Sequence, residues 1–287
     1  MNPAAAKLRE LIARDDLLVC PVIHDALTAR LAKEAGLPCA LMGGFGVAAT
    51  VYGMPDVGLI GFNEMVGQLR NLTAAVPGYP IIADGDTGYG NAMNVRRTVA
   101  EYARAGAACV LIEDQLWPKK CGHIDGPRQV IPHAEAVMKI RAAVEAAREH
   151  DILVLARTDA RGAHGFDEAI ARAKAFEAEG ADIVFMEALQ SADELGMYAS
   201  TIKAAPWANM MPKTPLVSRA DLKRMGFKFV TYNVALPAMI QAVKDVFAAV
   251  KADDMSHSPE LAPFGEVTRV VGLPDYNAME VRYATKN

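Results

Sequence analysis

IIADGDTGYGNAMNVRRTVAEYARAGAACVLIEDQ, residues 81–115, is the stretch of sequence that predicts the fold. Its short apolar runs Ile81–Ala83 and Cys109–Ile112 are predicted strands, because strands buried on both faces are short and continuously apolar. Between them, Asn94–Ala105 spaces its apolar side chains with a helical period. Gly106 follows this helix and can adopt the left-handed conformation that ends one. The stretch therefore predicts a strand–helix–strand unit.

The same alternation recurs along the chain and predicts eight strand-then-helix units. The other predicted strands are Leu17–Ile23, Cys39–Met42, Ile152–Ala156, Ile183–Met186, Trp207–Met210 and Lys228–Tyr232. The other predicted helices are Asp25–Ala35, Asn63–Ala75, Ala134–Glu149, Phe166–Glu179, Ala192–Lys203, Arg219–Met225 and Pro237–Ala252. The strand signal is weakest at Trp207–Met210, and a long Gly-rich loop is expected between Met42 and Asn63. Eight units favour a (β/α)8 TIM barrel, with a doubly wound open sheet as the alternative.

The composition is that of a folded, slightly acidic protein. The 287 residues are 52% apolar and carry a formal net charge of −4. This balance excludes a disordered chain, and the lack of a basic surplus argues against a nucleic-acid partner. We expect residues 1–250 to form one catalytic barrel domain. Residues 251–287, with a helix expected over Tyr276–Tyr283, are too few for a second domain and are expected to serve assembly.

The four cysteines do not form a disulfide framework. Cys20, Cys39 and Cys109 stand in apolar runs and are predicted to be buried, whereas Cys121 stands in a polar segment. This cysteine usage favours a reducing, cytoplasmic location. The N-terminal residues 1–16 carry charges where a signal peptide has its apolar core. The longest apolar stretch is too short to span a bilayer, so no membrane partner is expected.

Carboxylates follow several of the predicted strands. Asp84 and Asp86 follow the third strand, Glu113 ends the fourth, and Asp56 lies in the loop after the second. In a barrel these positions meet at one opening, where several carboxylates need a cation to remain ionised together. Oxygen ligands suit Mg²⁺ or Mn²⁺, with Asp84 expected as a direct ligand and the other three acids holding metal-bound waters. For Asp56 and Asp86 alone, a turn or capping role is the alternative.

A second group of reactive side chains follows the fourth strand. Cys121 lies between Lys119-Lys120 and His123, and cationic neighbours lower the pKa of a thiol. The alternative is a basic surface loop with an incidental cysteine.

Further polar residues end other predicted strands. Arg157 is a candidate clamp for a carboxylate, with an ion pair at the barrel rim as the alternative. Glu187 ends the sixth strand and Asn209 the seventh. His24 ends the first strand, where it could serve as a pocket acid–base or simply adjoin a helix.

Four segments together resemble the isocitrate lyase/phosphoenolpyruvate mutase superfamily. The segments are 84–91 (DGDTGYGN), 112–115 (IEDQ), 118–123 (PKKCGH) and 156–160 (ARTDA). The likeness spans roughly residues 5 to 250 and is strongest to the short lyases similar to 2-methylisocitrate lyase and 2,3-dimethylmalate lyase. The combination of segments 84–91 and 118–123 is typical of the carbon–carbon lyases of that family.

The resemblance implies an enzyme with Mg²⁺ as cofactor and a small anionic carboxylate as substrate. It implies cleavage of a 2-hydroxy di- or tricarboxylate, of methylisocitrate, dimethylmalate or citramalate type, into a 2-oxo acid and a second carboxylate. Cys121 would donate the proton and Arg157 would neutralise charge, with His123 and Glu187 orienting the substrate. The residues implied in substrate binding are Gly43, Gly44, Phe45, Lys119, Asn209, Thr214 and His24. It also implies a homotetramer in which the last helix is exchanged between paired subunits.

Three departures from the family pattern concern the substrate pocket. Gly43 replaces a Ser or Thr, Met210-Met211 replaces an acidic, longer turn, and Asn233 replaces a Pro or Ser. They favour a smaller or more apolar acid than methylisocitrate. An oxaloacetate hydrolase or decarboxylase of the same superfamily is the alternative function.

Overall fold

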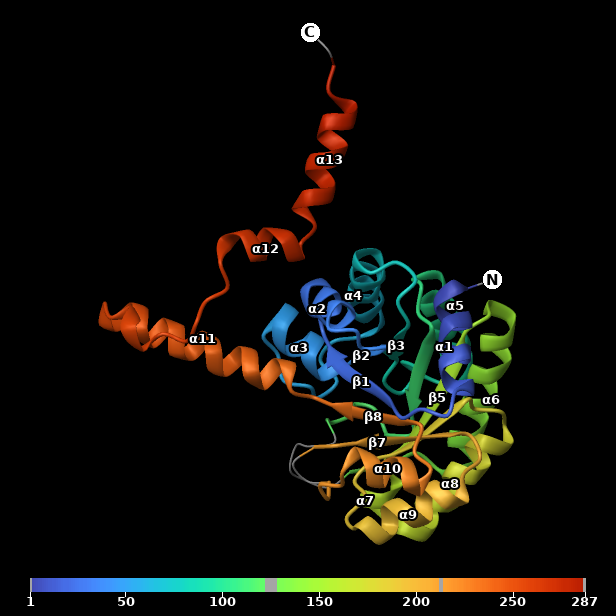
Figure 1. Ribbon diagram of the computed structural model, residues 1–287. Helices are drawn as coiled ribbons and strands as arrows, with labels where there is room; N and C mark the ends of the chain where they lie inside the picture. The colour runs from blue at the N-terminus through green and yellow to red at the C-terminus, as the bar shows by residue number, and fades with distance from the viewer. Residues whose placement is uncertain (1, 122–127, 212–213, 286–287) are drawn as a thin grey trace.

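The computed structural model describes residues 2–121, 128–211 and 214–285, and its centre is a closed barrel of eight parallel strands (Figure 1). The strands are β1 (Leu18–Ile23), β2 (Ala40–Met42), β3 (Ile81–Asp84), β4 (Cys109–Glu113), β5 (Leu153–Thr158), β6 (Ile183–Met186), β7 (Ala205–Asn209) and β8 (Phe229–Tyr232). Strand β8 pairs with β1, with Leu18 in register with Phe229. This closure confirms the TIM barrel and excludes the doubly wound sheet.

Helices follow the strands and cover the barrel (Figure 1). They are α2 (Ala26–Glu34), α4 (Phe62–Ala75), α5 (Ala92–Arg104), α6 (His133–His150), α8 (Phe166–Ala178), α9 (Ala192–Thr201), α10 (Arg219–Met225) and α11 (Ala235–Ala252). All eight were predicted, with bounds that differ by a few residues. The left-handed φ angles of Gly106 (+90°) and Gly226 (+97°) confirm the predicted helix ends.

The Gly-rich segment after β2 was predicted to be a loop, and this is wrong for its first part. The segment begins with helix α3 (Gly44–Tyr52). Its glycines permit close packing rather than irregular structure. A Cβ on Gly44 would lie 3.2 Å from Asp84 Oδ2, and one on Gly46 would lie 2.7 Å from His24 Cβ. The missing side chains therefore let the first turn of α3 sit directly against the ends of β1 and β3. Helices α1 (Pro3–Ala13) and α7 (Ala160–His164) are also additions to the prediction.

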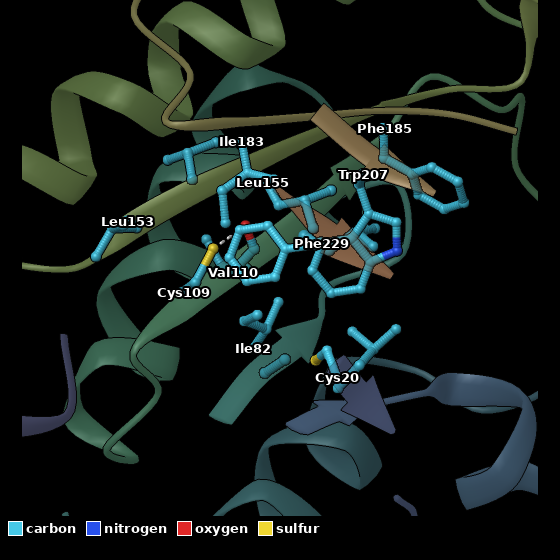
Figure 2. Close-up of a cluster of buried hydrophobic side chains, with 14 of the residues drawn as sticks. Cys20, Ile82, Cys109, Val110, Leu153, Leu155, Ile183, Phe185, Trp207 and Phe229 are labelled. Atoms are coloured by element: carbon cyan, nitrogen blue, oxygen red, sulfur yellow. Dashed lines mark hydrogen bonds between the residues drawn. The ribbon is translucent and has the colours of Figure 1, made fainter. Parts of the chain in front are cut away.

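The barrel interior is filled by apolar side chains, as Figure 2 shows. Trp207 is fully buried and stacks on Phe229, with ring centroids 4.8 Å apart. Trp207 thereby anchors β7, the strand with the weakest sequence signal. Cys20, Cys39 and Cys109 are fully buried, as predicted. Within the described residues, no helix is long and apolar enough to cross a membrane.

The C-terminal segment projects from the barrel along α11, and the helix that follows α11 returns to contact α2 (Figure 1). Helix α11 projects outward and is followed by α12 (Phe264–Val270) and α13 (Leu273–Tyr283). The chain leaves the barrel within α11, and the division of the chain at residue 251 stays a prediction. Its apolar spacing makes α11 an ordinary amphipathic helix in sequence, and only the structure shows that no barrel strand covers its apolar face.

Candidate active site

A cavity of about 630 Å³ opens at the carboxyl ends of the strands, where a barrel places its active site. Most of the residues predicted for the site line it: Gly43, Gly44, Phe45, Asp56, Asp84, Glu113, Lys119, Cys121, Arg157, Glu187 and Asn209. The structure thus brings together side chains from strands far apart in the sequence. It also adds apolar walls that sequence reasoning missed, among them Leu111 and Phe185, because inward and outward residues of a doubly buried strand are equally apolar.

Asp84 connects three elements at the floor of the cavity. Its Oδ2 accepts a hydrogen bond from the Gly44 N–H at 2.9 Å, and its Oδ1 accepts one from the Asp86 N–H at 3.0 Å. The Gly43 N–H donates to Ile23 O at 3.2 Å. Two of the three amides expected to hold the substrate, those of Gly43 and Gly44, therefore already have acceptors inside the protein.

Lys119 is the cation between two of the predicted metal-site acids. Its Nζ lies 2.7 Å from Asp56 Oδ1 and 2.8 Å from Asp86 Oδ1, and the side chain is 5% exposed. Burial lowers the pKa of Lys119, but the surrounding carboxylates, Asp86 foremost, outweigh this effect and raise it well above its usual range. Burial raises the pKa of Asp86 to about 6, against the opposing effect of Lys119. Asp86 lies behind Lys119 and outside the cavity lining, so the structure pairs Asp56 and Asp86 with an ammonium group.

Asp84 and Glu113, the two predicted metal-site acids that do not pair with Lys119, are available to bind a divalent ion. Glu113 is 3% exposed, and its Oε1 has no hydrogen-bond partner although it belongs to a residue that lines the cavity. Within the described residues, no three His, Cys, Asp or Glu side chains form a complete ligand set. Mg²⁺ commonly takes only one or two carboxylates and keeps several waters. Asp84 and the unpaired Glu113 oxygen therefore fit this ion, whereas a site built wholly from protein ligands is absent from that part of the chain.

Arg157 is held by three acids at the end of β5. Its Nε and Nη2 donate to Asp159 at 2.8 and 2.9 Å, and it lies 3.4 Å from both Glu113 Oε2 and Glu187 Oε2. Asn209 Nδ2 donates to the same Glu187 oxygen at 3.3 Å. Burial lowers the pKa of Arg157, but the nearby carboxylates of Asp159, Glu113 and Glu187 outweigh this effect and raise it well above its usual value. The guanidinium therefore stays charged beside the cavity.

Behind Arg157 lies a buried polar network that sequence reasoning missed. Asp114 accepts from the Thr158 hydroxyl at 2.7 Å, from the Asp159 N–H at 2.9 Å and from Arg172 Nη1 at 3.1 Å. Arg172 also donates to Ile131 O. This network fixes Asp159 and thereby the orientation of Arg157. Arg172 is buried although it is charged and stands in a helix, and no sequence pattern marks such a residue.

Cys121 lies at the cavity, half-buried, where the loop after β4 meets the loop after β2. Its N–H donates to Asp56 O at 3.1 Å, and Arg128 Nη2 donates to its carbonyl at 3.1 Å. These contacts hold the thiol-bearing residue among the lining residues. His123 lies outside the described residues.

His24 and Thr214 do not line the cavity. His24 is 1% exposed beneath α3, and its Nε2 lies 3.5 Å from Asp25 Oδ2. Burial lowers the pKa of His24, which favours the neutral ring. Thr214 is buried, and its N–H donates to Met211 O at 2.8 Å. Met211 lines the cavity in its place.

The Lys119 cluster predicts a stability effect. We expect Lys119→Met to destabilise the metal-free protein by roughly 3–5 kcal/mol, because Asp56 and Asp86 would remain buried without a cation. The melting temperature should fall by roughly 10 °C. Thermal unfolding in EDTA measures this, with Lys120→Met on the exposed neighbour as the matched control. Equal melting temperatures for the two variants would show that the cluster contributes nothing to stability.

Comparison with known proteins identifies the family. The family model described as phosphoenolpyruvate phosphomutase matches residues 8–251. The chain belongs to the phosphoenolpyruvate mutase/isocitrate lyase superfamily. It is 40% identical to 2,3-dimethylmalate lyase of Eubacterium barkeri over 98% of both chains. It is 38% identical to 2-methylisocitrate lyase of Aeropyrum pernix over 97% of this chain and 91% of the relative. Most of its relatives in this superfamily of enzymes are carbon–carbon lyases.

Two solved structures of the superfamily bear on the ligands. Oxaloacetate acetylhydrolase bound to the inhibitor 3,3-difluorooxalacetate superposes with a TM-score of 0.90 at 32% identity, covering 97% of this chain and 96% of the other. Phosphonopyruvate hydrolase bound to oxalate and Mg²⁺ superposes with a TM-score of 0.87 at 29% identity, covering 98% and 99%. Relatives within the superfamily therefore bind small dicarboxylates, and one of them does so together with Mg²⁺.

Proposed function

We propose that this protein is an oxo-acid lyase that uses Mg²⁺, or alternatively Mn²⁺. It would cleave a 2-hydroxy di- or tricarboxylate, of dimethylmalate, citramalate or methylisocitrate type, into a 2-oxo acid and a second carboxylate. The observation that carries the proposal is the shared cavity of Cys121, Arg157 and Asp84. It combines a proton donor, a fixed cation and a metal-binding carboxylate around one small space.

Asp84 would hold the metal directly and Glu113 would act through bound waters, whereas Asp56 and Asp86 pair with Lys119 beside this site. When bound, the ion supplies positive charge beside the oxo-acid half of the substrate. Lys119 holds the side chains of Asp56 and Asp86 in place through its two ion pairs. The magnesium found in phosphonopyruvate hydrolase supports this assignment.

The chain's own residues would bind and orient the substrate. The Phe45 N–H, in the first turn of α3, remains to donate to the oxo-acid half, since the Gly43 and Gly44 amides have internal acceptors. Arg157, held by Asp159, would stay charged beside the departing carboxylate. Asn209 and Glu187 would fix the substrate's orientation, and His123 would do so from the Cys121 loop.

Cys121 would deliver the proton that completes cleavage. When the carbon–carbon bond breaks, its electron pair stays on the α-carbon of the departing carboxylate. As the hydroxyl-bearing carbon becomes the carbonyl of the 2-oxo acid, the hydroxyl proton is released to solvent. The Cys121 Sγ–H supplies a proton to the departing carbon and becomes a thiolate, which recovers a proton from solvent, so the two protons balance. His24, buried outside the cavity, is not placed to take the substrate's hydroxyl proton.

The second candidate function is hydrolysis or decarboxylation of oxaloacetate. The superposition with oxaloacetate acetylhydrolase favours it. A panel of 2-hydroxy acids and oxaloacetate, scored for release of pyruvate, glyoxylate, oxalate and CO₂, separates the two functions. We expect Mg²⁺-dependent release of a 2-oxo acid from a 2-hydroxy dicarboxylate. Turnover of oxaloacetate alone would contradict the lyase assignment.

We further propose a homotetramer in which the C-terminal helices pack on a neighbouring subunit. One face of α11 exposes Ile240, Val243, Phe247 and Val250, with Phe247 68% exposed. These positions recur at helical spacing and form one continuous apolar face. An exposed apolar face of this length on a projecting helix is typical of an assembly surface. Phe264 and Tyr283 continue the exposed apolar surface along the extension.

Phe247→Asp should dissociate the assembly. The apolar face of α11 becomes buried when subunits pack together, and a charge on it would then have to lose its hydration. Light scattering after size exclusion measures the mass, with Gln241→Asp on the opposite, polar face as the control. We expect the Phe247 variant alone to elute as smaller species. An unchanged tetramer, or a monomeric wild type, would contradict this use of the extension.

A further inference from the structure

A second cavity, of about 780 Å³, lies beside the catalytic one. It is formed by the start of α4, the loop after β3, the residues that follow β4 and the first turns of α6. Gln115 lines both cavities and is the wall that they share. The proposed lyase reaction uses neither Gln115 nor any other residue of this second cavity.

One part of the cavity wall is aromatic. The Tyr89 ring meets the Phe62 ring edge-on at 5.8 Å and the Trp117 ring edge-on at 6.1 Å between centroids. The Arg97 guanidinium lies 4.1 Å from the Phe62 centroid, and Tyr89 Oη is 3.1 Å from Tyr102 Oη. These contacts hold the rings in place, so the wall is preformed and offers aromatic ring faces and edges to a ligand.

The same cavity contains a buried cation without a partner. Lys139, on α6, is 5% exposed and lines the cavity. In the described part of the chain, no acceptor lies within hydrogen-bond or ion-pair distance of its ammonium group. Burial lowers the pKa of Lys139, which the more distant Glu135, Glu113 and Asp114 counteract. The Lys139 side chain is withdrawn from most of its water and has no acceptor of its own in the described residues, so this position favours an incoming anion.

Gln115 provides a second unused donor. Its side chain is 3% exposed, and its Oε1 accepts from the Lys120 N–H at 3.0 Å, while its Nε2 has no partner. Glu135 also lines the cavity but lies exposed, one turn before Lys139. Lys139 and Gln115 thus each offer a donor without an acceptor beside the aromatic wall.

We propose that this second cavity binds a small carboxylate with a flat apolar body. The carboxylate would accept from Lys139 and Gln115, and the body would lie against Phe62, Tyr89 and Trp117. A ligand with these two parts satisfies both buried donors and covers the aromatic wall. The site is separate from the catalytic residues, so its occupant need not be the substrate.

Calorimetric titration of the full-length, Mg²⁺-loaded protein with 3-phenylpropionate tests the proposal. We expect 3-phenylpropionate to bind, and the uncharged 3-phenylpropanamide and inorganic phosphate to bind at least about tenfold more weakly, because each lacks one of the two parts. Lys139→Met should weaken binding of 3-phenylpropionate by about tenfold or more, whereas Lys174→Met, on the exposed face of α8, should leave it unchanged. The Met side chain is close to Lys in length and suits a buried position, so the variant should fold.

Fluorescence provides an independent reading. The chain has two tryptophans, and Trp207 is fully buried in the barrel core, so a change on binding reports Trp117. Trp117→Leu should weaken binding and remove the fluorescence change. Failure of the wild type to bind 3-phenylpropionate, or equal affinity in the two lysine variants, would overturn the assignment. Neither result depends on lyase activity.

Discussion

Cys121→Ser should reduce kcat by roughly 10²–10⁴-fold, the range expected when a positioned general acid is lost. The thiol lines the cavity together with Arg157 and Asp84, and its backbone is held by the Asp56 carbonyl and by Arg128. A serine hydroxyl fits this space and preserves those backbone contacts. It is a far weaker acid than a thiol, so proton delivery to the departing carbon should fail while KM and the melting temperature change little.

Cys39→Ala is the matched control for this experiment. Cys39 is fully buried in the barrel core and is remote from the cavity lining. We expect this variant to lose some stability but to retain turnover. Full activity of Cys121→Ser on the wild-type substrate would remove the thiol from the mechanism and favour the decarboxylase alternative.

Asp84→Asn should weaken Mg²⁺ and Mn²⁺ binding by more than about 100-fold, beyond the 10–100-fold loss typical of a residue that only supports a ligand. Asparagine retains an oxygen that can accept from the Gly44 N–H or the Asp86 N–H, so α3 and the loop after β3 should stay in place. What the substitution removes is the negative charge at the cavity floor. Turnover should fall with metal occupancy and recover in part at high metal concentration.

Calorimetric titration with Mn²⁺ measures this affinity, with Asp167→Asn on the exposed start of α8 as the control. Unchanged metal affinity combined with lost turnover would place the ion elsewhere and leave Asp84 a purely structural role. A loss of affinity in Glu113→Gln of 10–100-fold would agree with an acid that holds bound water.

The sequence predicts the barrel because its signal is local. Runs such as Ile81–Ala83 and Cys109–Ile112 mark strands, Gly106 marks a helix end, and eight repeats of this alternation are enough to close a barrel. From closure alone, Asp84, Glu113, Arg157 and Glu187 follow as neighbours, because strand ends share one opening. The segment 44–52 was missed as a helix because its glycines, which serve close packing, are also typical of loops.

The contacts within the site depend on loop conformations that no local pattern encodes. Lys119 and Asp56 are separated by 63 residues and Arg172 and Asp114 by 58, yet each pair is in direct contact. His24 looked like a pocket residue because it ends a strand. The structure buries it under α3, where the glycine at position 46 makes room for it.

The proposed chemistry is tested most directly by product analysis in D₂O with the Mg²⁺-loaded enzyme and the best 2-hydroxy acid from the panel. Proton NMR should show one 2-oxo acid and one second carboxylate for each substrate consumed, with a single deuterium on the α-carbon of the carboxylate. Cys121→Ser should form neither product at a comparable rate. Release of CO₂, or a carboxylate product without deuterium on its α-carbon, would contradict the lyase mechanism.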